Sequence, residues 1–285
     1  MPTLSFLLKC AENFLRQRGI AQARSEAEWI LAHLLHCRRC DLHAHLGKKM
    51  ERAVLSSFIS FIRRRGHREP LQYILGESDF YNISLRNDRR ALIPRPETEE
   101  LLEWIVTTWK NQPPKRILDL GTGSGAIGIA LAKAFFKSEV IAIDIDSDAL
   151  DLAMENAERN HVHNIAFVQS HWFENVCGCF DLIVANPPYL TATEIQNADP
   201  EVRDYEPIKA LYAEQEGMAD LLQILKTAPK FLNPSASLIM EMGLEHGNLL
   251  KTEALRLGFH SVQIRRDLSD RPRFFVASDY DTLGL

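Results

Sequence analysis

From about residue 116 onward, short apolar runs alternate with longer amphipathic stretches. We expect strands at ILDL, EVIAIDI, IAFVQS, DLIVA, SLIMEMG, SVQIRRDL and PRFFVAS, and helices at AIGIALAKAFF, ALDLAMENAERN, ADLLQILKTAPKFL and LLKTEALRLG. Strands separated by helices form βαβ units, which build a mainly parallel sheet. The last two runs are joined at 269–271 without a helix, so the last strand should be antiparallel. The pattern therefore predicts an α/β fold with a Rossmann-like, mostly parallel sheet.

The part of the chain before this region has a different pattern. Over residues 1–75, apolar side chains recur at helical spacing in three stretches, which predicts a small bundle of helices. The segment 76–96 combines turn-forming Asn and Asp residues with short strand-like runs and two prolines, which is typical of a hairpin. We therefore expect a helical domain over 1–75, a hairpin linker over 76–96 and the α/β domain over 97–285.

Charge is divided unevenly along the chain. The first 90 residues carry 16 Lys and Arg against 9 Asp and Glu, whereas the remainder carries 17 against 29. A basic front part can steer association with an acidic protein or an RNA, and an acidic back part disfavours broad contact with a phosphate backbone. The asymmetry indicates two parts with different partners, and a solvated surface without a role in binding is the alternative.

Composition also limits the class of protein. No apolar run approaches the roughly 20 residues that a membrane-spanning helix needs. The five cysteines are unevenly spaced, which is typical of reduced thiols in a cytoplasmic protein. Cys37 and Cys40 have the CxxC spacing of a zinc site, but no second pair follows at a usual distance and two arginines separate them. We expect no metal and no membrane contact.

A glycine-rich turn, DLGTGSG, follows the first strand of the sheet region. Glycines there allow positive φ angles and close approach of a ligand, and ligands of open α/β sheets lie beyond the carboxyl ends of the strands. The turn also matches the GxGxxG pattern of dinucleotide sites. The residues predicted to hold a cofactor in this turn are Asp119, Gly121, Thr122, Gly123, Ser124 and Gly125.

Two further strand ends carry candidate cofactor contacts. Asp144 ends the second strand, where a carboxylate can accept both hydroxyls of a ribose. Sites for NAD and for S-adenosylmethionine both use this geometry, so Asp144 does not separate them. A carboxylate at Asp119 favours a ligand that carries an ammonium and a sulfonium over a pyrophosphate. Trp172, after the third strand, can pack on an adenine, or it can close the core.

The fourth strand ends in the corner NPPY. The Asn186 amide oxygen and the Pro187 carbonyl are two acceptors side by side, and the prolines at 187 and 188 fix φ and hold that carbonyl in one direction. Two rigid acceptors suit a substrate NH2 group, and Tyr189 adds a flat face for a planar group. A proline stop at the end of a strand is the structural alternative.

This corner predicts methyl transfer to a planar NH2 group. Such a nitrogen is a poor nucleophile, and accepting both of its hydrogens raises its electron density. The electrophile would be a sulfonium methyl, so the protein mainly positions two reactants. We assign catalysis to Asn186, Pro187 and Tyr189, substrate binding to Asn186, Pro187, Pro188 and Tyr189, and cofactor contact also to Asn186. The residues alone leave glutamine, adenine and cytosine open as acceptors.

The order of GTGSG, the Asp144 strand end and NPPY resembles class I S-adenosylmethionine-dependent methyltransferases that methylate amino groups. Three further stretches, EPLQYILGESDFY (69–81), LIPRPETEELLEW (92–104) and VRDYEPIKALYAEQEGMAD (202–220), are similar to the release factor glutamine methyltransferases. The resemblance implies methylation of N5 of the glutamine in the GGQ loop of peptide-chain release factors, with S-adenosylhomocysteine as product. It implies that 121–125, Asp144 and Trp172 hold the cofactor, that 186–189 hold the glutamine amide, and that PRPETE orders the domain junction.

The same resemblance frames the expected partners and the alternatives. We expect a monomer whose substrate is a release factor and which has no direct contact with nucleic acid. A glutamine methyltransferase for a ribosomal protein, a nucleic-acid adenine-N6 methyltransferase and a nucleotide-binding oxidoreductase are the alternatives. One position departs from the family, which has an aspartate where this chain has His171. Cofactor affinity is therefore expected to depend on pH.

A basic cluster closes the third helical stretch of the front part. It comprises Arg63, Arg64, Arg65, His67 and Arg68. Cations at this position are favourable because they face the negative end of the helix dipole. The alternative is that the cluster contacts an acidic release factor.

Overall fold

The computed structural model describes residues 1–280, so the last five residues of the predicted α/β domain lie outside the described part. The chain forms two compact units. The smaller unit contains Met1–Glu77 and Asp199–Tyr205, and the larger contains Ser78–Ala198 and the chain from Glu206 onward. The expected hairpin linker over 76–96 therefore belongs almost entirely to the larger unit. The short segment 199–205, which we expected in the α/β domain, belongs with the helical unit.

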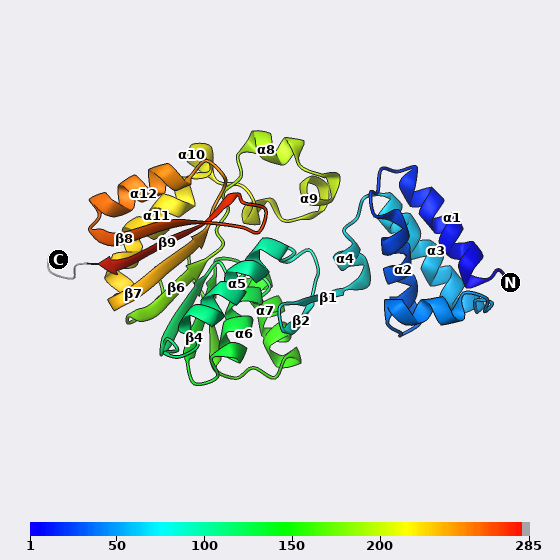
Figure 1. Cartoon of the computed structure of the whole chain (residues 1–285), viewed down its shortest axis with the longest axis horizontal. Helices are drawn as coiled ribbons and strands as arrows, with labels where there is room; N and C mark the ends of the chain where they lie inside the picture. Colours follow the sequence, from blue (N-terminus) through cyan, green and yellow to red (C-terminus); the bar gives the residue numbers. More distant parts are fainter. Residues whose placement is uncertain (281–285) are drawn as a thin grey trace. The chain divides into compact units, whose positions relative to one another are not determined.

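The smaller unit is the predicted bundle of helices (Figure 1). Its elements are α1 (Leu4–Arg16), α2 (Ala23–Leu34), the 3-10 helix η1 (Arg39–His45), α3 (Arg52–Gly66), α4 (Leu71–Leu75) and α9 (Pro200–Tyr205). The helices bury the apolar side chains that recur at helical spacing, among them Leu8, Leu15, Ile30 and Leu31. This common core explains why three amphipathic stretches fold together.

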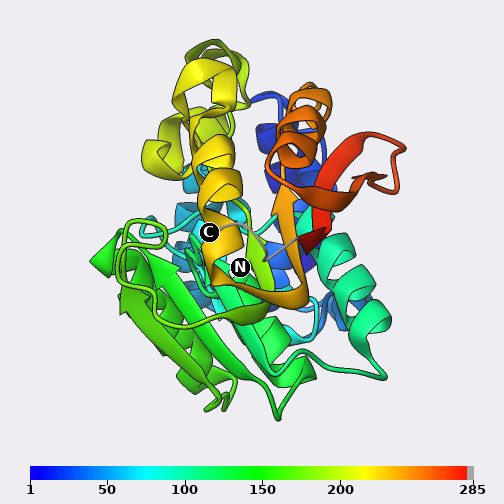
Figure 2. The ribbon, with the colours of Figure 1, turned by 90° about the vertical axis from the view of Figure 1, so that its left-hand side faces the viewer.

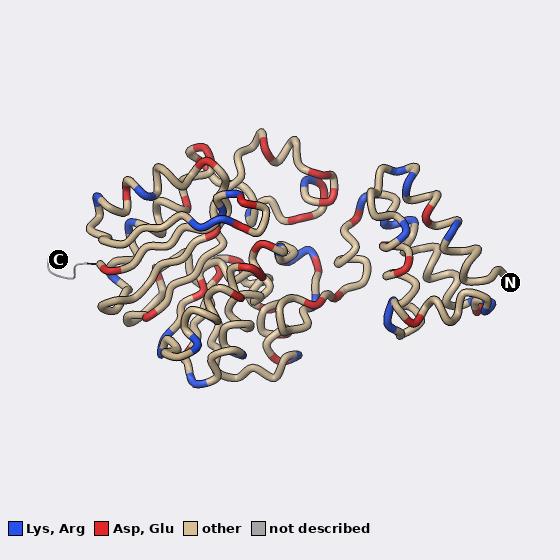
Figure 3. Tube along the Cα trace, in the orientation of Figure 1, with Lys and Arg blue, Asp and Glu red and all other residues tan. Residues whose placement is uncertain are grey.

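The basic cluster at the end of α3 is used within the smaller unit. Arg65 pairs with Glu201 of α9 at 2.7 Å and also with Glu26, and Arg68 donates to Glu201 at 2.6 Å. Arg64 pairs with a neighbouring glutamate in the same unit. Figure 3 shows Lys and Arg interspersed with Asp and Glu along these helices. Arg64, Arg65 and Arg68 therefore have acidic partners within the smaller unit, and their contact with an acidic release factor stays a prediction.

The larger unit is built on a seven-stranded sheet in the order β5-β4-β3-β6-β7-β9-β8. The strands are β3 (Arg116–Leu120), β4 (Glu139–Asp144), β5 (Ile165–Gln169), β6 (Phe180–Ala185), β7 (Leu232–Glu241), β8 (Phe259–Arg266) and β9 (Pro272–Tyr280). β9 runs antiparallel to β7 and β8, and the other neighbours are parallel. A separate hairpin, β1 (Glu77–Phe80) and β2 (Ile83–Arg86), precedes the sheet. The predicted α/β class and the antiparallel last strand are confirmed.

Helices cover both faces of this sheet (Figures 1 and 2). The helices of one face are α5 (Pro96–Trp109), α6 (Ala126–Ala134) and α7 (Ser147–Arg159), and those of the other are α11 (Ala219–Thr227) and α12 (Gly247–Arg256). Because successive side chains of a strand point to opposite faces, Ile117 packs in the first core while Leu118 and Leu120 pack in the second. Short connecting helices complete the unit, namely α8 (Ala192–Asn197), η2 (Ile208–Ala210), α10 (Glu214–Gly217) and η3 (Ala228–Phe231). Among residues 1–280, no helix has the length and apolar character needed to cross a membrane.

The strand order reverses at β3, and this reversal positions the site. From β3 the chain passes outward to β4 and β5, and it then returns to add β6 on the other side. Leu120 is paired with Ile143 of β4 and with Ala185 of β6, and Ala185 is paired with Met240 of β7. The strands therefore end at one level. Ligands of open α/β sheets bind at such a switch point, beyond the carboxyl ends.

Candidate active site

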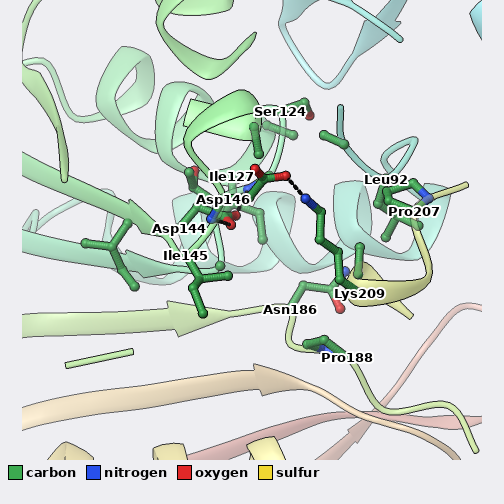
Figure 4. Close-up of a pocket in the computed structure, with 18 of the residues that line it drawn as sticks. Leu92, Ser124, Ile127, Asp144, Ile145, Asp146, Asn186, Pro188, Pro207 and Lys209 are labelled. Atoms are coloured by element: carbon green, nitrogen blue, oxygen red, sulfur yellow. Dashed lines mark hydrogen bonds and ion pairs between the residues drawn. The ribbon is translucent and has the colours of Figure 1, made fainter. Parts of the chain in front are cut away.

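A cavity of about 390 Å³ opens at this edge of the sheet (Figure 4). Eight of the predicted site residues line it, namely Gly121, Thr122, Gly123, Ser124, Asp144, Trp172, Asn186 and Pro188. The structure thus brings the ends of four strands around one space. Asp119, Gly125, Pro187 and Tyr189 are not among the lining residues.

The glycine turn is held against β4 by backbone hydrogen bonds. The N–H of Thr122 donates to the carbonyl of Ile143 at 2.8 Å, and the N–H of Gly123 donates to the Asp144 carboxylate at 2.8 Å. Gly121 has φ +70°, and a Cβ there would lie 3.4 Å from the ring of Trp172. A side chain at this position would be strained and would crowd the ring, so glycine lets the turn close against the tryptophan.

Asp119 lies behind the turn and is fully buried. Its Oδ2 atom accepts from the Thr122 hydroxyl at 2.6 Å and from the N–H of Gly128 at 2.8 Å. Burial raises the pKa of Asp119 to about 7. The expected direct contact with a charged ligand therefore has no counterpart in the cavity. Asp119 instead shapes the turn from inside the core, and Gly125 is the N-cap residue of α6.

Asp144 is the cavity carboxylate at the end of β4. Its two oxygens each accept one backbone N–H, from Gly123 at 2.8 Å and from Asp146 at 3.0 Å. Burial raises its pKa. Each carboxylate oxygen can accept a further hydrogen bond, so Asp144 can still receive ribose hydroxyls. Lys209 reaches over the same rim and pairs with Asp146, as Figure 4 shows.

Trp172 closes another side of the cavity. Its Nε1–H donates to Asp220 of α11 at 3.1 Å, and the residue has φ +46°, which is uncommon outside glycine. Asp220 also lines the cavity, and burial raises its pKa. His171 lies beside it and contacts Glu174 at 3.2 Å. Asp220 was missed in the sequence, because only the fold brings α11 to the end of β5.

The NPPY corner presents one face to the cavity and the other to a buried carboxylate. Asn186 and Pro188 line the cavity, whereas Pro187 is buried. The Tyr189 hydroxyl donates to Glu241 at 2.9 Å, so the ring's hydroxyl edge is turned to the core. Burial, followed by the nearby charge of Glu241, raises the pKa of Tyr189.

Thr98 and Glu241 are the supporting residues of the corner that the sequence did not single out. The Thr98 hydroxyl donates to Glu241 at 2.8 Å, and the Nδ2 of Asn186 lies 3.5 Å from the same hydroxyl oxygen. Thr98 belongs to the PRPETE stretch at the start of α5, and Arg95 of that stretch pairs with buried Glu206 at 2.8 Å. Thr98 thus connects this stretch to the NPPY corner, and Arg95 connects it to Glu206.

No group of three His, Cys, Asp or Glu side chains within the described residues is arranged to hold a metal ion. The five cysteines are free thiols, including Cys37 and Cys40.

Two family descriptions match this chain. The PrmC N-terminal domain family matches residues 7–76, and the methyltransferase small domain family matches residues 98–199. The release factor glutamine methyltransferase of Haemophilus influenzae is 36% identical over 281 residues, which cover 94% of this chain and 96% of that protein. The Rhodopirellula baltica protein of the same name is 34% identical and covers 95% of this chain. The chain belongs to the release factor glutamine methyltransferase family.

Solved structures agree with this assignment at the level of the fold. A methyltransferase from Pyrococcus furiosus superposes with a TM-score of 0.54 at 20% identity, over 70% of this chain and 91% of that chain. The catalytic domain of hMettl16 gives a TM-score of 0.54 at 18% identity. The enzyme has the class I methyltransferase fold, and its cofactor is S-adenosylmethionine.

The residues of the cavity fit this cofactor. One carboxylate at a strand end, a positive-φ glycine turn and a buried aromatic ring surround the space, with apolar walls from Ile127 and Ile145. A nucleoside needs such a combination of an apolar surface and a few convergent polar groups.

Proposed function

We propose that this enzyme methylates the side-chain amide nitrogen, N5, of the glutamine in the GGQ loop of peptide-chain release factors. The observation that carries the proposal is the position of Asn186, on the cavity wall and level with the glycine turn across paired strands. The names of its relatives supply the acceptor class.

The cofactor end of the cavity is assigned to the glycine turn, Asp144 and Trp172. Backbone groups of 121–124 would surround the amino-acid part of the cofactor, and Asp144 would accept the ribose hydroxyls. When bound, S-adenosylmethionine supplies a methyl group that its sulfonium has already activated.

The acceptor end is assigned to Asn186 and Pro187. The amide oxygen of Asn186 and the carbonyl of Pro187 would each accept one hydrogen of the glutamine NH2 group. This holds the nitrogen in place and raises its electron density as it becomes tetrahedral and cationic. No base is needed before attack, because the proton leaves after the nitrogen has become cationic.

The two units have separate roles in this proposal. The larger unit carries the chemistry, and residues 1–75 are assigned to recognition of the release factor. We propose that the enzyme acts as a monomer in the cytoplasm without binding nucleic acid, in keeping with the acidic charge of residues 91–285.

An acceptor panel tests the proposal. The full-length enzyme is incubated with S-adenosylmethionine labelled in the methyl group and with release factor, ribosomal proteins, RNA or DNA. We expect label only on the release factor, and none on a release factor whose GGQ glutamine is replaced by alanine. Label on RNA, DNA or a ribosomal protein in place of the release factor would contradict the proposal.

A further inference from the structure

The end of β7 lies beside the NPPY corner. Ala185 of β6 is paired with Met240 of β7, so the next residues, Asn186 and Glu241, leave neighbouring strands at the same level. Glu241 is 1% exposed, yet it carries a carboxyl group. A buried carboxylate is costly unless hydrogen bonds stabilise it, so its partners are informative.

Both oxygens of Glu241 have a hydroxyl partner, and both partners belong to the acceptor site. Oε1 accepts from the Tyr189 hydroxyl at 2.9 Å, and Oε2 accepts from the Thr98 hydroxyl at 2.8 Å. The Thr98 oxygen in turn lies 3.5 Å from Nδ2 of Asn186. This last contact is long, and hydrogen bonds of catalytic groups often tighten only when substrate is bound.

The direction of these hydrogen bonds is fixed when Glu241 is ionised. An ionised carboxylate can only accept, so the single proton of Thr98 and the single proton of Tyr189 both point to it. Thr98 then has only lone pairs left for Asn186. Asn186 must turn its NH2 group toward Thr98, which leaves its oxygen for the cavity.

We propose that Glu241 is a positioning residue for methyl transfer. It fixes the direction of the hydrogen bonds that run from Asn186 through Thr98, and it thereby presents the Asn186 oxygen to the substrate NH2. This inference rests on the proposed function of the site. The same negative charge lies behind the corner at which the substrate nitrogen becomes cationic, and a fixed charge in a buried site stabilises such a transition state.

The groups around Glu241 predict how its positioning role depends on pH. Burial is the largest influence and disfavours the ionised form of Glu241, as does the negative charge of Glu97, whereas Arg273 of β9 favours the ionised form. Thr98 and Tyr189 donate to it from α5 and from the corner. The net effect raises the pKa of Glu241 above its ordinary range. As pH falls, the carboxyl group therefore gains a proton earlier than an exposed glutamate does. The protonated carboxyl group can donate a hydrogen bond, so the direction of the hydrogen bonds from Asn186 through Thr98 is no longer fixed. We therefore expect kcat to fall.

Glu241→Gln in the full-length enzyme tests the proposal, because it keeps the shape of the side chain and turns one acceptor into a donor. We expect kcat on release factor to fall about 10- to 100-fold, the size expected when a hydrogen bond to a charged group is lost. The KM for release factor and the Kd for S-adenosylmethionine should change far less. The acid-side loss of kcat that we expect in the wild type should disappear.

A matched pair at Thr98 gives an independent readout. Thr98→Val removes the hydroxyl at nearly constant volume and should lower kcat to a similar extent. Thr98→Ser keeps the hydroxyl and should retain most of the activity. If Glu241→Gln does not fold, the difference in kcat between Thr98→Val and Thr98→Ser tests the proposal.

Two results would overturn the inference. One is a folded Glu241→Gln enzyme with wild-type kcat and an unchanged pH profile, and the other is equal kcat for Thr98→Val and Thr98→Ser. A purely structural role would lower the unfolding temperature and leave kcat per folded molecule unchanged. Methyl transfer by the wild type to release factor tests the proposed function separately, so the two failures are distinguishable.

Discussion

The glycine turn after β3 and the NPPY corner after β6 leave neighbouring strands at the same level, and each is backed by a buried carboxylate. Asp119 backs the turn through partners only three and nine residues away. Glu241 backs the corner through two hydroxyls that lie 52 and 143 residues away. The carboxylate behind the turn thus finds its partners within one contiguous stretch, whereas the carboxylate behind the corner gains its partners only once α5, β6 and β7 have packed together.

This difference predicts a division of labour between the two ends. Changes at the turn should act on cofactor affinity and on local stability. Changes at the corner should act on kcat, because we propose that the corner contacts the group that changes charge in the transition state. The variants below are ordered from the largest expected effect to the smallest.

Asn186→Ala should have the largest effect. It removes the oxygen that we propose accepts from the substrate nitrogen, and we expect kcat to fall by about 10²- to 10³-fold. Cofactor binding, measured by calorimetry, should change little by comparison. Asn248→Ala, at an exposed position on α12, is the matched control and should behave as wild type. A loss that fell mainly on cofactor Kd would break the proposed division between the two ends.

Asp119→Asn should change the pH dependence of stability. The folded-state pKa of Asp119 is raised to about 7, above the unfolded value of about 3.9. The folded state therefore binds the proton more tightly, and the free energy of unfolding should fall as pH rises between these two values. From about pH 5 to about pH 8 this amounts to roughly 2–3 kcal/mol. Asparagine does not titrate, so the variant should lose this component.

Urea unfolding of both proteins at the two pH values measures this component. The comparison uses differences between wild type and variant, so that other titrating groups cancel. An unchanged pH dependence in Asp119→Asn would show that the carboxyl group behind the turn is not the source.

Gly121→Ala should have the smallest effect of the three. At φ +70° an added Cβ is strained and lies 3.4 Å from the Trp172 ring. A cost of about 1–2 kcal/mol corresponds to an increase of roughly tenfold in cofactor Kd. The loss should appear in the KM for cofactor more than in kcat. Gly47→Ala is the control, because a Cβ there meets no atom within 4 Å. A mainly kcat effect of Gly121→Ala would contradict the comparison.

Much of the fold was predictable because its signals are local. The seven strands, the glycine turn and the NPPY corner each lie within a few consecutive residues, and the register then brings their ends together. Asp119 was predicted as a ligand contact, but strand alternation already indicates otherwise. Leu118 and Leu120 point to one core, so Asp119 must point to the opposite face, toward α6.

The missed features depend on tertiary contacts. In the sequence, Glu241 resembles any residue at the end of a strand. It has two hydroxyl partners only because β7 pairs with β6 and α5 packs beside them. The segment 199–205 has no apolar periodicity, and it joins the helical unit through Glu201 and through the Tyr205 hydroxyl, which donates to a backbone carbonyl at 2.8 Å. Charges paired across 133 residues leave no local pattern in the sequence.

The position of the transferred methyl group tests the central claim most directly. Release factor treated with the enzyme and S-adenosylmethionine is digested, and the modified peptide is fragmented in a mass spectrometer. We predict one methyl group on the side-chain nitrogen of the GGQ glutamine, formed by the wild type and by Asn248→Ala but not by Asn186→Ala. A methyl group on any other residue, or equal modification by Asn186→Ala, would contradict the account.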